Sequence, residues 1–193
     1  MRKSMVNRET NETKVNISLD LNKSGEITIS TGVGFFDHML HLLAFRSGVS
    51  MSVECKGDLH IDDHHSVEDV GISMGQAFRE ALGDKKGIAR YGTATIPMDE
   101  ALAECALDIS GRGFLVFNAQ IPAPMAGDFC TEMVEEFFRA FAIQAGITLH
   151  INLAYGKNTH HIIEAIFKSV GAAIGQAIKI VGADCVPSTK GML

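Results

Sequence analysis

The chain has 193 residues, of which 46% are apolar and 21% charged, so it is neither a disordered nor a collagen-like chain. Twenty-three acidic against 17 basic residues give a net charge of −6, which argues against nucleic acid as the main partner. No apolar run reaches the roughly 18 residues that span a bilayer, and no secretory segment follows Met1. We therefore expect a cytoplasmic protein with no membrane association.

The first half of the chain is expected to begin with strands. Apolar and polar residues alternate over 15–21, and a Ser24-Gly25 turn leads into a second alternating run over 26–29, so the pattern predicts a β-hairpin. The other elements expected here are a helix over 36–45, a strand over 49–55 and a helix over 64–82.

The second half of the chain shows the same grouping of strands and then helices. Strands followed by helices indicate an α+β fold, in which the helices of each half cover one face of a mixed sheet. The expected strands are 93–98, 101–109, 114–119 and 147–153, and the expected helices are 131–145 and 160–181.

The two halves also resemble each other in sequence. The aligned segments are 37–40 with 135–138 and, after a two-residue difference in length, 64–68 with 160–164. Both copies read as a helix, a glycine, a strand, a loop and a second helix that opens with His-His. We expect two tandem repeats, residues 1–87 and 88–193, that form one compact unit with a shared core.

Two His-His-x-x-Glu motifs occupy matching positions of this repeat. On a helix the first histidine and the glutamate share a face and can bind one metal ion, whereas the second histidine diverges by about 100°. The simplest arrangement has two metal sites, each combining one His/Glu pair with the second histidine of the other motif. The repeat adds His38 in one half and Glu136 in the other. Imidazole and carboxylate ligands favour Mn²⁺ or Fe²⁺ over structural zinc. The motifs are His64-His65-x-x-Glu68 and His160-His161-x-x-Glu164.

Two further features need an interpretation. Asp62 and Asp63 precede the first motif, and we interpret them as helix-capping residues, with the orientation of an imidazole as the alternative. The four cysteines are too far apart along the chain for a zinc finger, so we expect reduced and mostly buried thiols. They are Cys55, Cys105, Cys130 and Cys185.

Seven short segments carry a resemblance to a known family. They are GVGFFDHML at 32–40, DDHHSVED at 62–69, PMDEAL at 97–102, SGR at 110–112, TEMVEEFF at 131–138, NTHHIIEA at 158–165 and PSTKG at 187–191. Together they resemble imidazoleglycerol-phosphate dehydratase, and the similarity runs from about residue 8 to the C-terminus.

The resemblance implies a hydro-lyase of histidine biosynthesis that converts D-erythro-imidazoleglycerol phosphate into imidazole acetol phosphate. It also implies two Mn²⁺ ions per active site and a homo-oligomer of 24 subunits built from trimers, with active sites where subunits meet. The two four-stranded sheets are expected back to back. By the family pattern one metal is bound by His38, His65, His160 and Glu164. The other is bound by His64, Glu68, Glu136 and His161.

The chemistry of this dehydration accounts for the residue types. If the substrate imidazole binds the metals as imidazolate, its electrons can expel the C3 hydroxyl to give a diazafulvene-like intermediate, while a carboxylate shuttles the C2 proton. The resemblance assigns this base, which also contacts the substrate, to Glu12; the residues alone do not distinguish it from Glu9. The remaining substrate-binding candidates, for the phosphate, are Arg90, Arg112, Lys168, Ser188, Thr189 and Lys190.

Three residues depart from the family pattern. Glu136 stands where many members carry His, and a carboxylate also ligates Mn²⁺. Arg46 occupies a position often held by His, and Gly113 one where Pro is usual. Two other functions stay open from the residues alone: a metal-dependent hydrolase, and a non-catalytic shell that metal ions hold together.

Overall fold

The computed structural model describes residues 2–22, 24–182, 185–191 and 193. Both halves form a mixed sheet and two long helices. The elements of the first half are β1 (Lys3–Glu9), β2 (Thr13–Asp20), β3 (Ile27–Ser30), α1 (Gly34–Ser47), β4 (Ser50–Gly57) and α2 (His64–Leu82). Those of the second are β5 (Tyr91–Met98), β6 (Ala101–Asp108), β7 (Phe114–Asn118), β8 (Met125–Ala126), β9 (Phe129–Cys130), α3 (Met133–Ala145), β10 (Thr148–Tyr155) and α4 (Thr159–Ala177).

The two four-stranded sheets have the same topology. Their strand orders are β1-β2-β4-β3 and β5-β6-β10-β7, with only β8 and β9 added as a separate small ribbon. In each sheet three strands are antiparallel, and the fourth, β3 or β7, runs parallel to its neighbour β4 or β10. The expected α+β class with two repeated halves is confirmed.

The expected hairpin between residues 15–21 and 26–29 is wrong. β2 and β3 do not pair; both pair with β4, so that Leu19 and Ile27 lie on opposite sides of Met51. The strand β1 was not expected, because only Val6 of its residues is buried and its sequence is largely polar. It forms the true hairpin of this half with β2, in a register that sets Val6 opposite Ile17.

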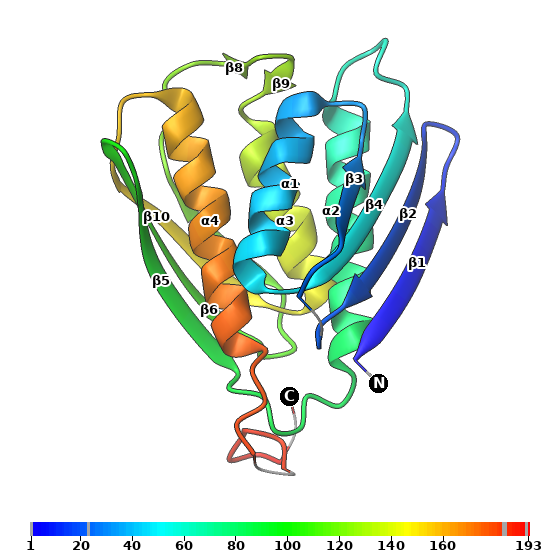
Figure 1. Ribbon diagram of the computed structural model, residues 1–193, viewed down its shortest axis with the longest axis vertical. Coiled ribbons are helices and arrows are strands. Elements are labelled where there is room, and N and C mark those ends of the chain that lie inside the picture. The colour runs from blue at the N-terminus through cyan, green and yellow to red at the C-terminus, as the bar shows by residue number, and fades with distance from the viewer. Residues whose placement is uncertain (1, 23, 183–184, 192) are drawn as a thin grey trace.

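The four long helices lie between the two sheets (Figure 1). The resemblance implies that the two sheets are back to back. In the structure the helices lie between the sheets, so the helix-covered face of each sheet points toward the other sheet. Helix α1 packs on α4, and α2 packs on α3, so that both helix contacts join one half to the other. Buried residues from both halves accordingly form one hydrophobic cluster.

Glycine permits the close approach of these helix pairs. A Cβ atom on Gly75 of α2 would lie 2.7 Å from the carbonyl oxygen of Phe141 on α3. A Cβ atom on Gly171 of α4 would lie 2.6 Å from the carbonyl oxygen of Leu43 on α1. The two glycines are counterparts in the repeat, so both helix pairs depend on the same packing device. No described helix is long and apolar enough to cross a membrane.

Candidate functional site

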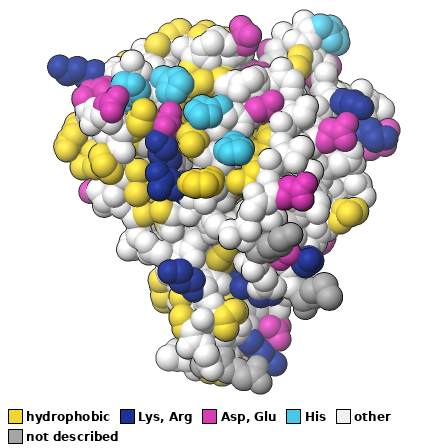
Figure 2. Space-filling view, in the orientation of Figure 1, with side chains coloured by type: hydrophobic (Ala, Val, Ile, Leu, Met, Phe, Trp, Pro, Cys, Tyr) yellow, Lys and Arg dark blue, Asp and Glu magenta, His cyan; other side chains and the backbone are white. Residues whose placement is uncertain are grey.

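All four long helices begin at the same end of the molecule, which is the end away from the two chain termini (Figure 1). Histidine side chains gather near this end, beside acidic and basic groups (Figure 2). Unpaired backbone N–H groups give a helix N-terminus a partial positive charge. The repeat therefore brings both His-His-x-x-Glu motifs to this one end of the molecule, each in the first turn of a helix.

The first cluster consists of His38, His160 and Glu164. One ligand atom from each residue lies within 4.8 Å of the other two. His160 Nε2 is 3.1 Å and His38 Nε2 is 3.7 Å from the same oxygen, Oε2 of Glu164. Lys168, one helical turn further along α4, donates to the other oxygen, Oε1. Burial, the largest single effect, acts to raise the pKa of Glu164, but the hydrogen bond and charge of Lys168 together with His160 and His38 outweigh it and lower the pKa.

The second cluster repeats this arrangement on α2 and α3, with wider spacing. His64 Nε2 lies 3.8 Å from Glu68 Oε2. Glu136 does not contact either group directly, but it lines the same cavity of about 150 Å³ as Glu68. Arg139, which lines this cavity too, places its Nε atom 3.5 Å from Glu136 Oε2. Glu68 and Glu136 thus face one space from neighbouring helices of different halves.

The second histidine of each motif lies outside these clusters and contacts a carboxylate that the sequence did not indicate. His65 Nδ1 is 3.0 Å from Asp58 Oδ2, and His161 Nδ1 is 2.7 Å from Glu100 Oε2. The hydrogen bond that His65 donates to Asp58 raises the pKa of His65, and the one that His161 donates to Glu100 raises the pKa of His161. The structure therefore brings together three of the four expected ligands around Glu164, and it leaves His65 and His161 apart.

Glu12 lies in the loop between β1 and β2, and its Oε1 atom is 3.8 Å from His65 Nε2. Glu9, the other candidate, forms an ion pair with Lys14 at 3.2 Å. The loop is held against α2 by Asp69, a buried carboxylate that accepts hydrogen bonds from Arg8 at 2.9 Å and from the Thr13 hydroxyl. The position of Asp69 beside Glu68 could not be interpreted from sequence, because its partners are more than 50 residues away.

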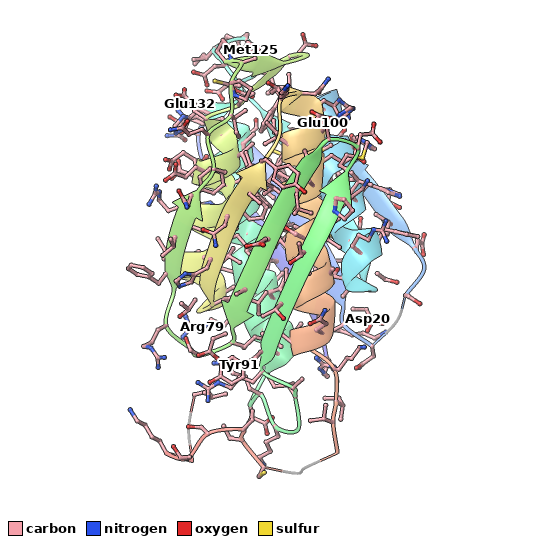
Figure 3. All side chains as sticks on the ribbon, turned by 90° about the vertical axis from the view of Figure 1, so that its left-hand side faces the viewer. Asp20, Arg79, Tyr91, Glu100, Met125 and Glu132 are labelled. Atoms are coloured by element: carbon pink, nitrogen blue, oxygen red, sulfur yellow. The ribbon has the colours of Figure 1, made fainter. Side chains whose placement is uncertain are left out.

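The expected phosphate-binding residues other than Lys168 lie at the opposite end of the molecule. Figure 3 shows this separation: Tyr91, which follows Arg90, and Glu100 mark the two ends of the same strand hairpin. Arg90 makes a bidentate ion pair with Asp108, at 2.7 and 3.0 Å, and donates to the Pro187 carbonyl at 2.8 Å. The side chain of Arg112 is largely exposed.

The C-terminal segment that includes Ser188, Thr189 and Lys190 follows this anchor. Ser188 organises it as a turn, because the Ser188 hydroxyl accepts from the Lys190 backbone at 3.2 Å and its carbonyl accepts from Gly191 at 3.0 Å. Arg90 thus holds Pro187, the residue before this turn. Within one chain these groups are not brought to the histidine clusters.

The two aspartates before α2 have different partners. Asp62 accepts a hydrogen bond of 2.9 Å from the backbone of His64, which is a capping interaction at the start of the helix. Asp63 accepts one of 2.8 Å from the backbone of Cys130 and so ties the β8–β9 ribbon to this end. Neither contacts an imidazole. All four cysteines are free; two are buried, Cys130 is half-buried and Cys185 is exposed.

The donor set fits the metal that the resemblance implies. The first cluster offers two imidazole nitrogens and a carboxylate held rigidly by burial, and the second offers one imidazole and two carboxylates. Nitrogen and oxygen donors without a thiolate suit Mn²⁺ in a five- or six-coordinate site. Neither cluster alone completes such a site from the residues described.

Comparison with known proteins agrees with this geometry. The model of the family described as imidazoleglycerol-phosphate dehydratase matches residues 31–174. Proteins of that name are 54% identical in Oceanobacillus iheyensis, over all of both chains, and 55% identical in Clostridium botulinum, over 97% of this chain and 96% of the relative.

Two solved structures have the same fold over nearly the whole chain. Imidazoleglycerol-phosphate dehydratase from Staphylococcus aureus is 48% identical, with a TM-score of 0.85 over 92% of this chain and 99% of that one. The enzyme from Pyrococcus furiosus, solved in complex with (S)-C348, is 34% identical, with a TM-score of 0.84 over 97% of this chain and 100% of that one. The chain therefore belongs to the imidazoleglycerol-phosphate dehydratase family, whose members are hydro-lyases.

Proposed function

We propose that this protein dehydrates D-erythro-imidazoleglycerol phosphate to imidazole acetol phosphate, as a cytoplasmic enzyme of histidine biosynthesis. The observation that carries the proposal is the cluster of His38, His160 and Glu164, with Lys168 bonded to the same carboxylate. Its duplication on α2 and α3 indicates two sites, and the family match supplies the substrate.

We propose two Mn²⁺ ions per active site. When bound, they would act as Lewis acids that stabilise negative charge on the substrate imidazole, as imidazolate, and on the departing oxygen. One ion would be held by His38, His65, His160 and Glu164. The other would be held by His64, Glu68, Glu136 and His161.

Glu12 would move the C2 proton in this scheme. Its Oε1 atom lies 3.8 Å from His65 Nε2, whereas the carboxylate of Glu9 forms an ion pair with Lys14. Asp69 anchors both ends of the loop through the side chains of Arg8 and Thr13, while the side chain of Glu12 is exposed. A base that must reach a substrate carbon needs this combination of an anchored loop and an exposed carboxylate.

A complete site would require more than one copy of the chain. The candidate phosphate-binding residues other than Lys168 lie at one end of the molecule and the metal-binding candidates at the other. The eight-residue strand β5 runs between the two ends and spans about 26 Å, which is longer than one small substrate. His65 and His161 contact Asp58 and Glu100 and lie outside the clusters whose ligand sets they are expected to complete. Both facts support assembly into a homo-oligomer in which neighbouring subunits share sites, and we propose the 24-subunit particle built from trimers.

The direct test mixes the protein with Mn²⁺ and imidazoleglycerol phosphate and follows the product by ultraviolet absorbance. The proposal predicts product formation that depends on Mn²⁺, without release of inorganic phosphate. A metal-dependent hydrolase would instead release phosphate. No turnover of the substrate by a metal-loaded, fully assembled sample would overturn the proposal.

A further inference from the structure

His65 and His161 are the two expected metal ligands that no cluster contains, and each has its Nδ1 atom against a carboxylate. Both oxygens of Asp58 lie close to His65 Nδ1, at 3.0 and 3.2 Å. Glu100 Oε2 lies 2.7 Å from His161 Nδ1. Asp58 follows β4 and Glu100 lies in the turn between β5 and β6, so the two carboxylates come from different places in the repeat.

The chemistry of these contacts determines which ring nitrogen carries the proton. An ionised carboxylate can only accept hydrogen bonds, so Nδ1 must be the donor in both pairs. In the neutral ring Nε2 then holds the lone pair, which is the form that binds a metal ion. The nearest acidic oxygens to Nε2 are those of Glu12, at 3.8 Å, and Asp99, at 3.6 Å, which are too distant for hydrogen bonds.

We propose that Asp58 and Glu100 are positioning residues, which hold His65 and His161 in the Nδ1–H tautomer and present Nε2 to the metal. The inference rests on the metal sites of the proposed function. Carboxylates that accept from the second nitrogen of a ligating histidine commonly set its tautomer and orientation, and their loss weakens metal binding by about 10- to 100-fold.

The two carboxylates are held differently, and this difference makes the proposal testable. Glu100 uses its other oxygen, Oε1, to accept from the backbone N–H groups of Asn158 at 2.7 Å and Lys157 at 3.2 Å. These bonds fix the turn against the start of α4, and the hydrogen bond from His161 with that from Asn158 lowers the pKa of Glu100 to about 2. Asp58 directs both oxygens at His65.

An amide at each position should therefore have opposite consequences. In Glu100→Gln the side chain has only one oxygen, and the backbone N–H groups of Lys157 and Asn158 need it as their acceptor. The NH₂ group of the glutamine therefore faces His161 Nδ1. Nδ1 must then accept, the proton moves to Nε2, and the ring can no longer ligate. In Asp58→Asn the side chain can turn its oxygen toward His65 Nδ1 and keep the original tautomer. Asp58→Leu removes the acceptor altogether.

The experiment measures Mn²⁺ binding by electron paramagnetic resonance on the full-length protein, with Glu104→Gln on the exposed face of β6 as the matched control. We expect wild type, Asp58→Asn and Glu104→Gln to bind two ions with similar affinity. Glu100→Gln and Asp58→Leu should each lose about 10- to 100-fold in affinity at one of the two sites.

A second measurement needs no variant. Solid-state ¹⁵N spectra of the metal-free wild type, recorded at pH 9 so that the rings are neutral, should show His65 and His161 as Nδ1–H tautomers. Nε2–H rings, or unchanged Mn²⁺ affinity in both Glu100→Gln and Asp58→Leu, would overturn the positioning role. A wild type that binds no Mn²⁺ but shows Nδ1–H rings would refute the metal sites of the proposed function instead.

Discussion

Glu12 and His65 face each other between the β1–β2 loop and the first turn of α2, with Glu12 Oε1 3.8 Å from His65 Nε2. The hairpin of β1 and β2 creates this relationship, because it carries the loop to the end of the molecule where the helices begin. Glu9, three residues earlier, lies within β1 and points to Lys14 on the neighbouring strand.

Replacement of Glu12 by Gln should remove the proton shuttle and leave the rest of the site intact. We expect kcat to fall by about 10²- to 10⁴-fold, which corresponds to roughly 3–5 kcal/mol of transition-state stabilisation. Mn²⁺ content and particle size should not change. Steady-state kinetics and metal analysis test this, with Glu9→Gln as the control that should keep its activity. Near-normal turnover by Glu12→Gln would move the base to Glu9 or to a metal-bound hydroxide.

Removal of metal should dissociate the particle and stop turnover together. The clusters involve helices of both halves, and their open positions are expected to be filled from other subunits, so a metal ion ties separate elements together. Histidine must be neutral to ligate, so protonation of the imidazoles in acid should have the same effect as a chelator. Light scattering and activity should fall in parallel and return with Mn²⁺. A chelated sample that kept both its full size and its activity would contradict this expectation.

Replacement of Lys190 by Ala should weaken substrate binding more than chemistry. The phosphate does not react, so its contacts are the same in the ground state and the transition state and affect KM rather than kcat. A lost charge-assisted hydrogen bond corresponds to an increase in KM of about 10- to 100-fold. Lys56→Ala is a matched control, because Lys56 is exposed and pairs only with Glu54 on the same strand. A fall in kcat at unchanged KM would argue against a phosphate contact.

Replacement of Gly75 by Ala should destabilise the fold. Alanine improves helix propensity by about 1 kcal/mol. The added Cβ, however, would lie 2.7 Å from the Phe141 carbonyl oxygen and 2.9 Å from the Ala145 backbone nitrogen, so α2 and α3 must separate. Overpacking costs typically about 1–3 kcal/mol, which exceeds the propensity gain. Thermal unfolding should show a lower Tm. Gly34→Ala, whose Cβ meets nothing within 4 Å, should leave it nearly unchanged.

The cysteines should differ sharply in reactivity toward a thiol reagent at pH 8. Burial raises the pKa of Cys105 to about 12, so its thiolate is scarce at any pH below that value, and reagent cannot reach it. Cys185 is exposed and should react rapidly. Mass spectrometry of the labelled native protein should find Cys185 modified and Cys105 unmodified until denaturant is added. Rapid labelling of native Cys105 would show that this strand opens locally.

The sequence predicted the helices and the proximity of His160 to Glu164 because both depend on short-range spacing. His160 and Glu164 are four residues apart on a helix, so their proximity follows from helix geometry alone, and the 64–82 helix has the expected bounds. The pairing of β2 and β3 with β4 depends on contacts far apart along the chain, which local turn chemistry does not encode.

The supporting residues of the site were less accessible to sequence reasoning. Asp58, Asp69 and Glu100 are single carboxylates whose partners are set by how loops meet helices, and no periodic pattern marks them. Asp69 and Glu100 had a signal, since they lie within the family-like segments 62–69 and 97–102, whereas Asp58 had none. From sequence alone, an acidic residue in a two-residue turn such as Glu100 is interpreted as a solvated side chain. Its role becomes visible only in the structure, where His161 lies beside it.

The pairing of α1 with α4 and of α2 with α3 has a symmetric consequence. If the two repeats were exchanged, α1 would take the place of α3 and α2 that of α4. Each helix pair would then become the other pair. A half-length polypeptide that associated with a copy of itself would therefore rebuild both pairs, with equivalent ligands on each. The present chain has the organisation of a twofold dimer joined into one polypeptide. Joining allows the two sites to differ, and the change between His38 and its counterpart Glu136 is such an asymmetry.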